Sequence, residues 1–148
     1  MPEGDTIWRT ARALHAALAG RTVIAFRSSM PAVAAAAERL QVVGRRVEAA
    51  EARGKHLLVR FAGGPVLHTH LGMRGSWRLK RAGSARSSPA RARAAIETAE
   101  AVAVCALAPV VELLSAAQAA AHSALRRLGP DLLAPGFDSG AAGRRLRA

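Results

Sequence analysis

The chain has 148 residues, enough for one domain with its own hydrophobic core, and its formal net charge of +12 makes an anionic partner such as nucleic acid the first hypothesis. Arginine supplies nearly all of this charge in a chain rich in alanine, glycine and valine, which is equally typical of a GC-rich genome, so charge alone leaves both explanations open. The single cysteine, Cys105, excludes an internal disulfide and a zinc site with two thiolates, and no apolar run reaches the roughly 20 residues of a membrane span. We expect a soluble cytoplasmic protein in which Cys105 is a buried spectator.

The N-terminal third begins with a helix signal. Apolar residues recur at helical spacing from Ile7 to Leu18, and Gly20 is placed to end the helix, which predicts a helix over residues 6–19. Residues 22–26 have the β-branched content of a strand. The alanine-rich residues 31–40 fit either a short helix or a loop.

The middle of the chain predicts antiparallel strands. Apolar residues alternate over residues 57–61, two glycines follow at 63 and 64, and residues 66–71 continue the pattern, which is typical of a hairpin. Residues 76–80 alternate apolar and polar, so we expect a half-buried strand with a basic outer face. Seven basic residues and no acidic one lie between Arg74 and Arg93, with glycine, serine and proline at the centre, which favours a mobile basic loop.

The C-terminal part predicts more strands and one more helix. Apolar segments between residues 91 and 114 would supply two or three strands. A second helix over residues 115–127 would end at Gly129 and Pro130. Residues 139–148 are small and basic, and we expect them to be unanchored.

The first residues carry candidate chemistry. The initiator methionine is usually removed before a residue as small as Pro2, which leaves a secondary amine beside Glu3. An α-amine has a pKa near 8 and so keeps a useful unprotonated fraction at neutral pH. It can attack the anomeric carbon of a sugar and expel the base, and the iminium ion that forms permits strand cleavage by elimination. Proline at a helix entry and glutamate at a helix N-terminus are also ordinary structural choices, so the tripeptide alone is weak evidence.

Four segments strengthen this interpretation because they occur together: MPEGDT at residues 1–6, RGKHLL at 53–58, HTHLGMRGSWR at 68–78 and LGPDLL at 128–133. In this order and spacing they resemble the formamidopyrimidine-DNA glycosylase and endonuclease VIII family, and MPEGDT with GSWR is closer to the endonuclease VIII branch. The resemblance covers the family's N-terminal catalytic domain over residues 1–133 and leaves 134–148 as the start of an interdomain linker. It implies a mainly β fold, a two-sheet antiparallel β-sandwich with an N-terminal helix and a second helix near the C-terminus.

The resemblance also implies catalytic roles. Pro2 matches the nucleophile, Glu3 the general acid/base, and Lys55 the hairpin lysine that contacts the phosphate beside the lesion and supports catalysis. For Lys55 the alternative is a solvated charge at a strand end. Lys55 is one of two lysines in an arginine-dominated chain, and it directly follows Arg53 and Gly54. This position favours selection for lysine, because a compact ammonium group differs physically from a guanidinium group.

Further residues match the family's DNA contacts. His70 matches a histidine that binds backbone phosphate, and Met73 matches the side chain that fills the gap left by a flipped base. A core methionine is the alternative for Met73, but its flanking glycines favour an exposed turn. Arg74 and Arg78 would be generic phosphate contacts. His68 and His70 share a face of a strand, as a metal pair would, but no third ligand is in view and we expect no metal.

The implied function is base-excision repair of damaged double-stranded DNA, by removal of oxidised bases and cleavage of abasic sites through a proline Schiff base. The family continues with a helix-two-turn-helix module and a zinc finger, and this chain ends about where that module would begin. We therefore expect that this chain binds no cofactor and that its activity is impaired. We also expect a nucleoid-associated bacterial protein, with room for a protein partner that completes the cleft. The alternatives are a non-catalytic DNA-binding remnant and a basic domain of ribosomal type.

Overall fold

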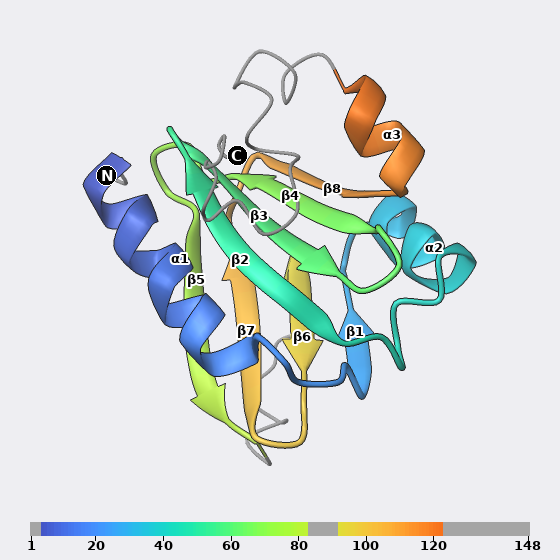
Figure 1. The fold of residues 1–148 in the computed structure, drawn as a ribbon. Coiled ribbons are helices and arrows are strands. Elements are labelled where there is room, and N and C mark those ends of the chain that lie inside the picture. Colours follow the sequence, from blue (N-terminus) through green and yellow to red (C-terminus); the bar gives the residue numbers. More distant parts are fainter. Residues whose placement is uncertain (1–3, 83–91, 123–148) are drawn as a thin grey trace, which may run out of the picture. The chain divides into compact units, whose positions relative to one another are not determined.

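The computed structural model describes residues 4–82 and 92–122 (Figure 1). It divides into two compact units, residues 1–116 and 117–148, and the first unit contains both sheets. The elements in chain order are α1 (Gly4–Leu18), β1 (Ala25–Arg27), α2 (Pro31–Arg39), β2 (Val47–Arg53), β3 (His56–Phe61), β4 (Val66–His70), β5 (Ser76–Arg81), β6 (Ala94–Glu97), β7 (Ala101–Ala106), β8 (Val110–Leu114) and α3 (Ala116–Ala121).

The strands form two antiparallel four-stranded sheets, in the orders β1-β6-β7-β5 and β2-β3-β4-β8. Leu57, Val59 and Phe61 point inward from β3 and are fully buried, as the alternation along this strand predicted. They belong to one core cluster with Ile96 of β6 and Cys105 of β7, so the inner faces of the two sheets share a core. The predicted β-sandwich is confirmed.

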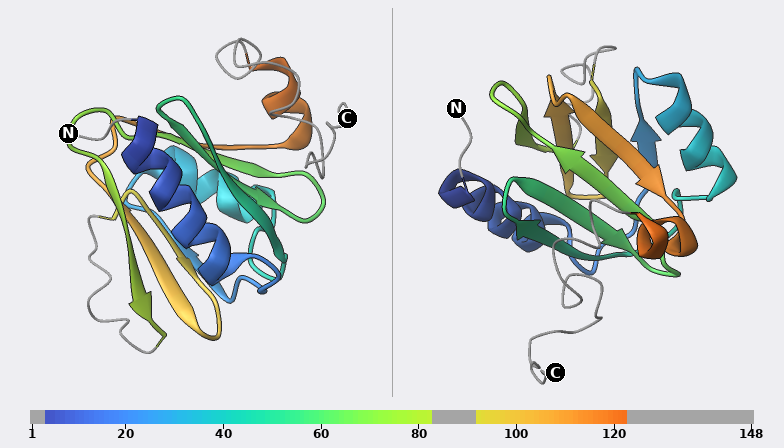
Figure 2. Two further views of the ribbon diagram at one scale, coloured as in Figure 1. Left: turned by 60° about the vertical axis from the view of Figure 1, so that its left-hand side comes forward. Right: turned by 90° about the horizontal axis from the view of Figure 1, so that it is seen from above.

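Two helices cover the open sides of the sandwich (Figures 1 and 2). Helix α1 packs against β2 and β5, which are edge strands of different sheets, and α2 contacts the opposite edge strands β1 and β8. The apolar stripe that predicted α1 is the face that it buries, from Ile7 to Leu18. The first turn of α1 therefore has a fixed position relative to both sheets.

The elements follow the sequence predictions with a few differences. The helix expected over residues 6–19 and the hairpin of β3 and β4 are present, and residues 91–114 contain three strands. The ambiguous residues 31–40 form a helix, with Pro31 in its first turn where its missing N–H costs nothing. The strand expected over 22–26 is shorter and later, because Thr22 makes only an isolated bridge to Arg46.

The C-terminal predictions are only partly described. Helix α3 begins at Ala116, one residue after the predicted start. The rest of the predicted helix, its Gly129 stop and the tail over 139–148 lie outside the described residues, as do residues 83–91 of the basic loop. Residues 76–81 of that basic segment form β5. No helix among the described residues is long and apolar enough to cross a membrane.

Candidate functional site

Three segments meet at one end of the first unit: the start of α1, the turn between β2 and β3, and the turn between β4 and β5 (Figures 1 and 2). Each of the three contains or adjoins one of the matched sequence segments. Pro2 and Glu3 lie outside the described residues, and α1 begins directly after them at Gly4. The sandwich thus brings together segments that are far apart in the sequence.

The β2–β3 turn presents Lys55. Strand β2 ends at Arg53 and β3 begins at His56, so Gly54 and Lys55 form the turn between paired residues. Gly54 has a φ of +57°, in the left-handed region that the tight turn requires. Lys55 is exposed, and among the described residues it forms no ion pair. Its ammonium group is therefore available to an external anion.

The β4–β5 turn presents Met73, whose side chain is 67% exposed, and Arg74, which is also exposed. Two glycines shape this turn. Gly72 has a φ of +63°, and a Cβ on Gly75 would lie only 2.4 Å from the carbonyl oxygen of Leu71. The turn therefore packs tightly at its base while its tip carries a long apolar side chain into solvent. An exposed turn, rather than a core position, is what the flanking glycines of Met73 predicted.

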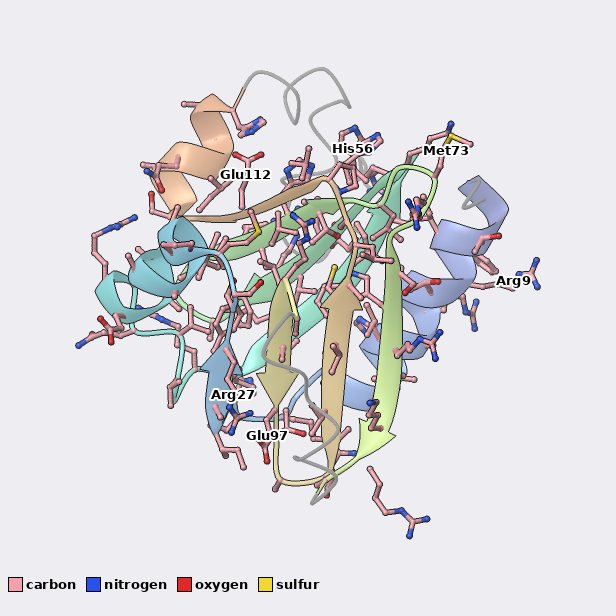
Figure 3. The ribbon with its side chains drawn as sticks, turned by 180° about the vertical axis from the view of Figure 1, so that it is seen from behind. Arg9, Arg27, His56, Met73, Glu97 and Glu112 are labelled. Atoms are coloured by element: carbon pink, nitrogen blue, oxygen red, sulfur yellow. The ribbon has the colours of Figure 1, made fainter. Side chains whose placement is uncertain are left out.

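Three histidines and one carboxylate share the outer face of sheet β2-β3-β4-β8: His56 on β3, His68 and His70 on β4, and Glu112 on β8. Figure 3 labels His56 and Glu112. Nδ1 of His56 lies 2.8 Å from Nε2 of His68, and Nδ1 of His68 lies 3.1 Å from a carboxylate oxygen of Glu112. The rings of His56 and His70 meet edge to face with centroids 4.8 Å apart. His68 is 2% exposed, so both of its ring nitrogens serve these internal contacts.

The sequence singled out His68 and His70 but missed His56 and Glu112. His56 stands inside the matched segment RGKHLL, next to Lys55, and this was the available signal. No feature of the sequence pointed to Glu112, because only the strand register places it opposite His68. The expected sharing of a face by His68 and His70 is present.

The fold does not bring Arg78 to the end of the sandwich where Lys55, Met73 and His70 lie. Trp77 points into the core from β5, so Arg78 points to the outer face of sheet β1-β6-β7-β5. His70 points to the outer face of the other sheet. Arg78 and His70 thus project from opposite faces of the sandwich.

Cys105 takes no part in this site. It is fully buried on the core side of β7, opposite Trp77 in the register. Burial raises the pKa of its thiol to about 12, an effect that Arg93 opposes more weakly. The thiol is therefore neutral and unreactive at physiological pH, as expected of a buried spectator.

The family model described as the formamidopyrimidine-DNA glycosylase N-terminal domain matches residues 1–108. The chain belongs to this family. Its curated relatives include a probable endonuclease 8 2 of Streptomyces coelicolor, 42% identical over 150 residues, and the DNA-(apurinic or apyrimidinic site) lyase Nei2 of Mycolicibacterium smegmatis, 37% identical over 148 residues. The endonuclease 8 of Escherichia coli is 32% identical over 146 residues. These names agree with the resemblance to the endonuclease VIII branch.

The match covers 100% of this chain but 52% of the Streptomyces protein and 55% of the Mycolicibacterium protein. The chain thus spans about half the length of these relatives of the formamidopyrimidine-DNA glycosylase family. Among solved structures, Lactococcus lactis Fpg in complex with DNA that contains N7-benzyl-Fapy-dG aligns with a TM-score of 0.69 at 22% identity, over 87% of this chain and 49% of that chain. Lactococcus lactis Fpg bound to DNA with an abasic site aligns with a TM-score of 0.68 at 22% identity, over 87% of this chain and 50% of that chain. These likenesses show the fold.

Proposed function

We propose that this chain carries the catalytic groups of a base-excision repair enzyme that acts on damaged double-stranded DNA as a glycosylase and abasic-site lyase. The observation that carries the proposal is the meeting of three segments at one end of the sandwich: the start of α1, the turn with the exposed Lys55, and the turn with the exposed Met73. A nucleophilic amine, a phosphate-binding cation and an apolar wedge are the groups that excision of a flipped nucleotide requires. The names of the curated relatives support the same reaction class.

In the proposed mechanism the Pro2 amine is the nucleophile. Its nitrogen forms a bond to the sugar C1′ and the bond from C1′ to the base breaks, with Glu3 as the acid that protonates the ring oxygen or the departing base. At an abasic site the leaving group is water. The resulting iminium ion acidifies the C2′ proton, and loss of this proton breaks the C3′–O bond and releases the strand with a terminal phosphate. The amine and the carboxyl supply the chemistry, so we propose a lyase step without a cofactor.

In this proposal the two turns provide most of the contacts with DNA. We propose that Lys55 holds the phosphate beside the lesion and that His70 and Arg74 bind neighbouring phosphates of the same backbone. Met73 would enter the base stack and occupy the space left by the flipped nucleotide. Arg78 projects from the other face of the sandwich, so any phosphate that it binds would lie away from this end.

These relatives are about twice as long as this chain, and we propose that a second body of protein closes the cleft over the DNA, either in the same polypeptide or in a partner protein. Base excision needs both sides of the cleft, because a stacked nucleotide must be pulled from the duplex. Abasic-site cleavage needs mainly the groups on this chain. We place the reaction in the bacterial cytoplasm, where the nucleoid DNA lies.

The test is strand cleavage of a duplex with one abasic site by two forms of the chain, one with Pro2 as the free N-terminus and one with Met1 retained. We expect cleavage by the first form and none above background by the second, since a blocked nitrogen cannot form the iminium ion. Equal cleavage by both would overturn the role of Pro2. Tight DNA binding without cleavage by either form would favour the non-catalytic DNA-binding alternative.

A further inference from the structure

Trp8 and Arg12 form a stacked pair on the outer side of α1. The guanidinium carbon of Arg12 lies 4.9 Å from the centroid of the Trp8 ring, within the roughly 6 Å at which a cation over an aromatic ring is attracted to it. The two residues are four apart, the spacing at which side chains on one face of a helix meet. Trp8 is 53% exposed and Arg12 is also exposed, so the pair is open to solvent.

The stacking leaves the hydrogen-bond donors of Arg12 unused. A guanidinium group that lies over a ring is held by its face, while its N–H donors point outward in its plane. Among the described residues, the side chain of Arg12 forms no ion pair or hydrogen bond. The guanidinium groups of Arg21 and Arg27, by contrast, are each paired with a carboxylate. Arg12 is therefore a positioned cation whose donors are available to an external anion.

Helix α1 has a basic outer side. From Thr6 to Leu18 it carries Arg9 and Arg12 and no acidic residue. Figure 3 shows Arg9 pointing away from the sheets on this helix. Phosphates are the complementary groups for such a surface, in agreement with the formal net charge of +12.

Helix α1 connects this pair to the proposed reaction site. It begins at Gly4, directly after Pro2 and Glu3, at the end of the sandwich where the two turns of the proposed site meet (Figures 1 and 2). A helix rises about 1.5 Å per residue, so Arg12 lies about 12 Å along the axis from the start of α1. One strand of a duplex advances about 3.4 Å per nucleotide, so this distance corresponds to roughly four nucleotides. A duplex whose damaged nucleotide lies at Pro2 can therefore bring a phosphate of its flank to Arg12.

We propose that Arg12 binds a backbone phosphate about four nucleotides from the damaged nucleotide, and that Trp8 holds the guanidinium group of Arg12 in place for this contact. Trp8 is a positioning residue, because it acts on the DNA only through Arg12. DNA is favoured over an acidic protein surface because Arg12 lies on the helix that follows the nucleophile Pro2. This inference rests on the proposed function for its ligand, and it adds the outer side of α1 to the DNA contacts of the two turns.

The contact is tested with duplexes that contain an uncleavable tetrahydrofuran abasic analogue. In each duplex a single phosphate of one flank is replaced by an uncharged methylphosphonate, the replaced position moves outward from the analogue along each flank in turn, and Kd is measured. For the unaltered chain we expect a position about four nucleotides from the analogue, on one side, at which the replacement raises Kd about three- to tenfold. In Arg12→Ala the replacement at this position should have no further effect, while replacements at the other positions keep theirs.

Arg39→Ala is the matched control, because Arg39 is an exposed arginine on α2, which contacts the opposite edge strands of the sandwich. It removes the same charge and should leave the effect of every methylphosphonate unchanged. Trp8→Leu should reduce the effect at the Arg12-dependent position, and Trp8→Phe should largely retain it, since either aromatic ring can hold the guanidinium group. In an Arg12→Ala chain, Trp8→Leu should have no further effect on Kd. A merely structural role of Trp8 would instead weaken binding without regard to the position of the methylphosphonate.

Two results would overturn the inference and leave the proposed function standing, provided that the tetrahydrofuran duplex is still preferred over undamaged DNA. If the unaltered chain and Arg12→Ala respond alike to every methylphosphonate, Arg12 does not bind DNA, and an acidic protein surface becomes the better partner for this side of α1. If Trp8→Leu weakens binding further in an Arg12→Ala chain, Trp8 contacts the DNA itself and is not a positioning residue.

A third result would overturn both. If no form of the chain prefers the tetrahydrofuran duplex, the proposed function is wrong. The analogue then does not fix the register of the protein on the duplex, no methylphosphonate position can depend on Arg12, and the inference fails with the function on which it rests.

Discussion

Trp77 and Thr69 join the two sheets across the core, because the indole nitrogen of Trp77 on β5 donates a hydrogen bond of 3.3 Å to the hydroxyl oxygen of Thr69 on β4. Thr69 itself donates to the carbonyl oxygen of Leu57, so its hydroxyl group both donates and accepts a hydrogen bond. This link lies at the base of the β4–β5 turn. It fixes the two strands between which Met73 and Arg74 are presented.

Trp77→Phe should lower the free energy of unfolding by about 1–3 kcal/mol, because it removes a buried hydrogen bond and leaves unfilled volume in the core. Trp8→Phe is the matched control, since Trp8 is 53% exposed on α1 and its replacement should cost less than about 0.5 kcal/mol. Urea unfolding of both variants measures the difference. Equal losses would show that the link between Trp77 and Thr69 contributes nothing particular.

Lys55→Ala should weaken binding to abasic and undamaged DNA alike and flatten the salt dependence of the binding constant by about one unit of slope. It should also slow abasic-site cleavage. Lys80→Ala is the matched control, because it removes the same charge from β5, away from the proposed site. Binding isotherms at several salt concentrations test this, and identical effects of the two substitutions would reduce Lys55 to one cation among many.

Cleavage of a pre-formed abasic site should exceed excision of thymine glycol by this chain by at least about two orders of magnitude. Excision must first flip a stacked nucleotide, which costs a few kcal/mol, and each ~1.4 kcal/mol that the protein fails to supply reduces the rate about tenfold. Single-turnover nicking of the two duplexes gives the ratio. Comparable rates would mean that the cleft is already complete, through a dimer or through the basic segment around Arg86.

Cys105 predicts a pH dependence of stability. Its folded pKa of about 12 lies above the ordinary 9.0, so burial of the neutral thiol stabilises the fold fully below about pH 9 and loses this contribution as pH rises toward 12. Between pH 8 and 10.5 the loss should be about 2 kcal/mol. Urea unfolding of the unaltered chain and of Cys105→Ala measures it, and the variant should lack this part of the decline. A parallel decline in both would contradict the assignment.

Local patterns predicted much of the fold. The apolar stripe of α1 and the alternation along β3 each describe a face that a single element buries, so the sequence of that element suffices. The glycines on either side of Met73 likewise predicted an exposed turn. The boundaries of β1 depended on pairing with β6, which lies about 70 residues later, and no local pattern contains that information.

Those contacts of the candidate site that cross strands could not be predicted from the sequence. The contacts that run from Glu112 through His68 to His56 depend on the register of β8, β4 and β3, and the sequence separation between Glu112 and His68 hides them. For Arg78, the sequence predicted the direction of the side chain but not the face of the sandwich on which it lies. Its outward direction follows from the inward Trp77, but which face of the sandwich it occupies follows only from the sheet order.

The central claim is that Pro2 forms the covalent intermediate, and the most direct test is to locate that bond. The processed chain is incubated with an abasic duplex and borohydride, which reduces the iminium ion to a stable amine, and the cross-linked peptide is sequenced by mass spectrometry. The account predicts the sugar remnant on the N-terminal peptide, at the nitrogen of Pro2, and no cross-link when Met1 is retained. A remnant on Lys55 or Lys80, or a cross-link that survives with Met1 in place, would contradict it.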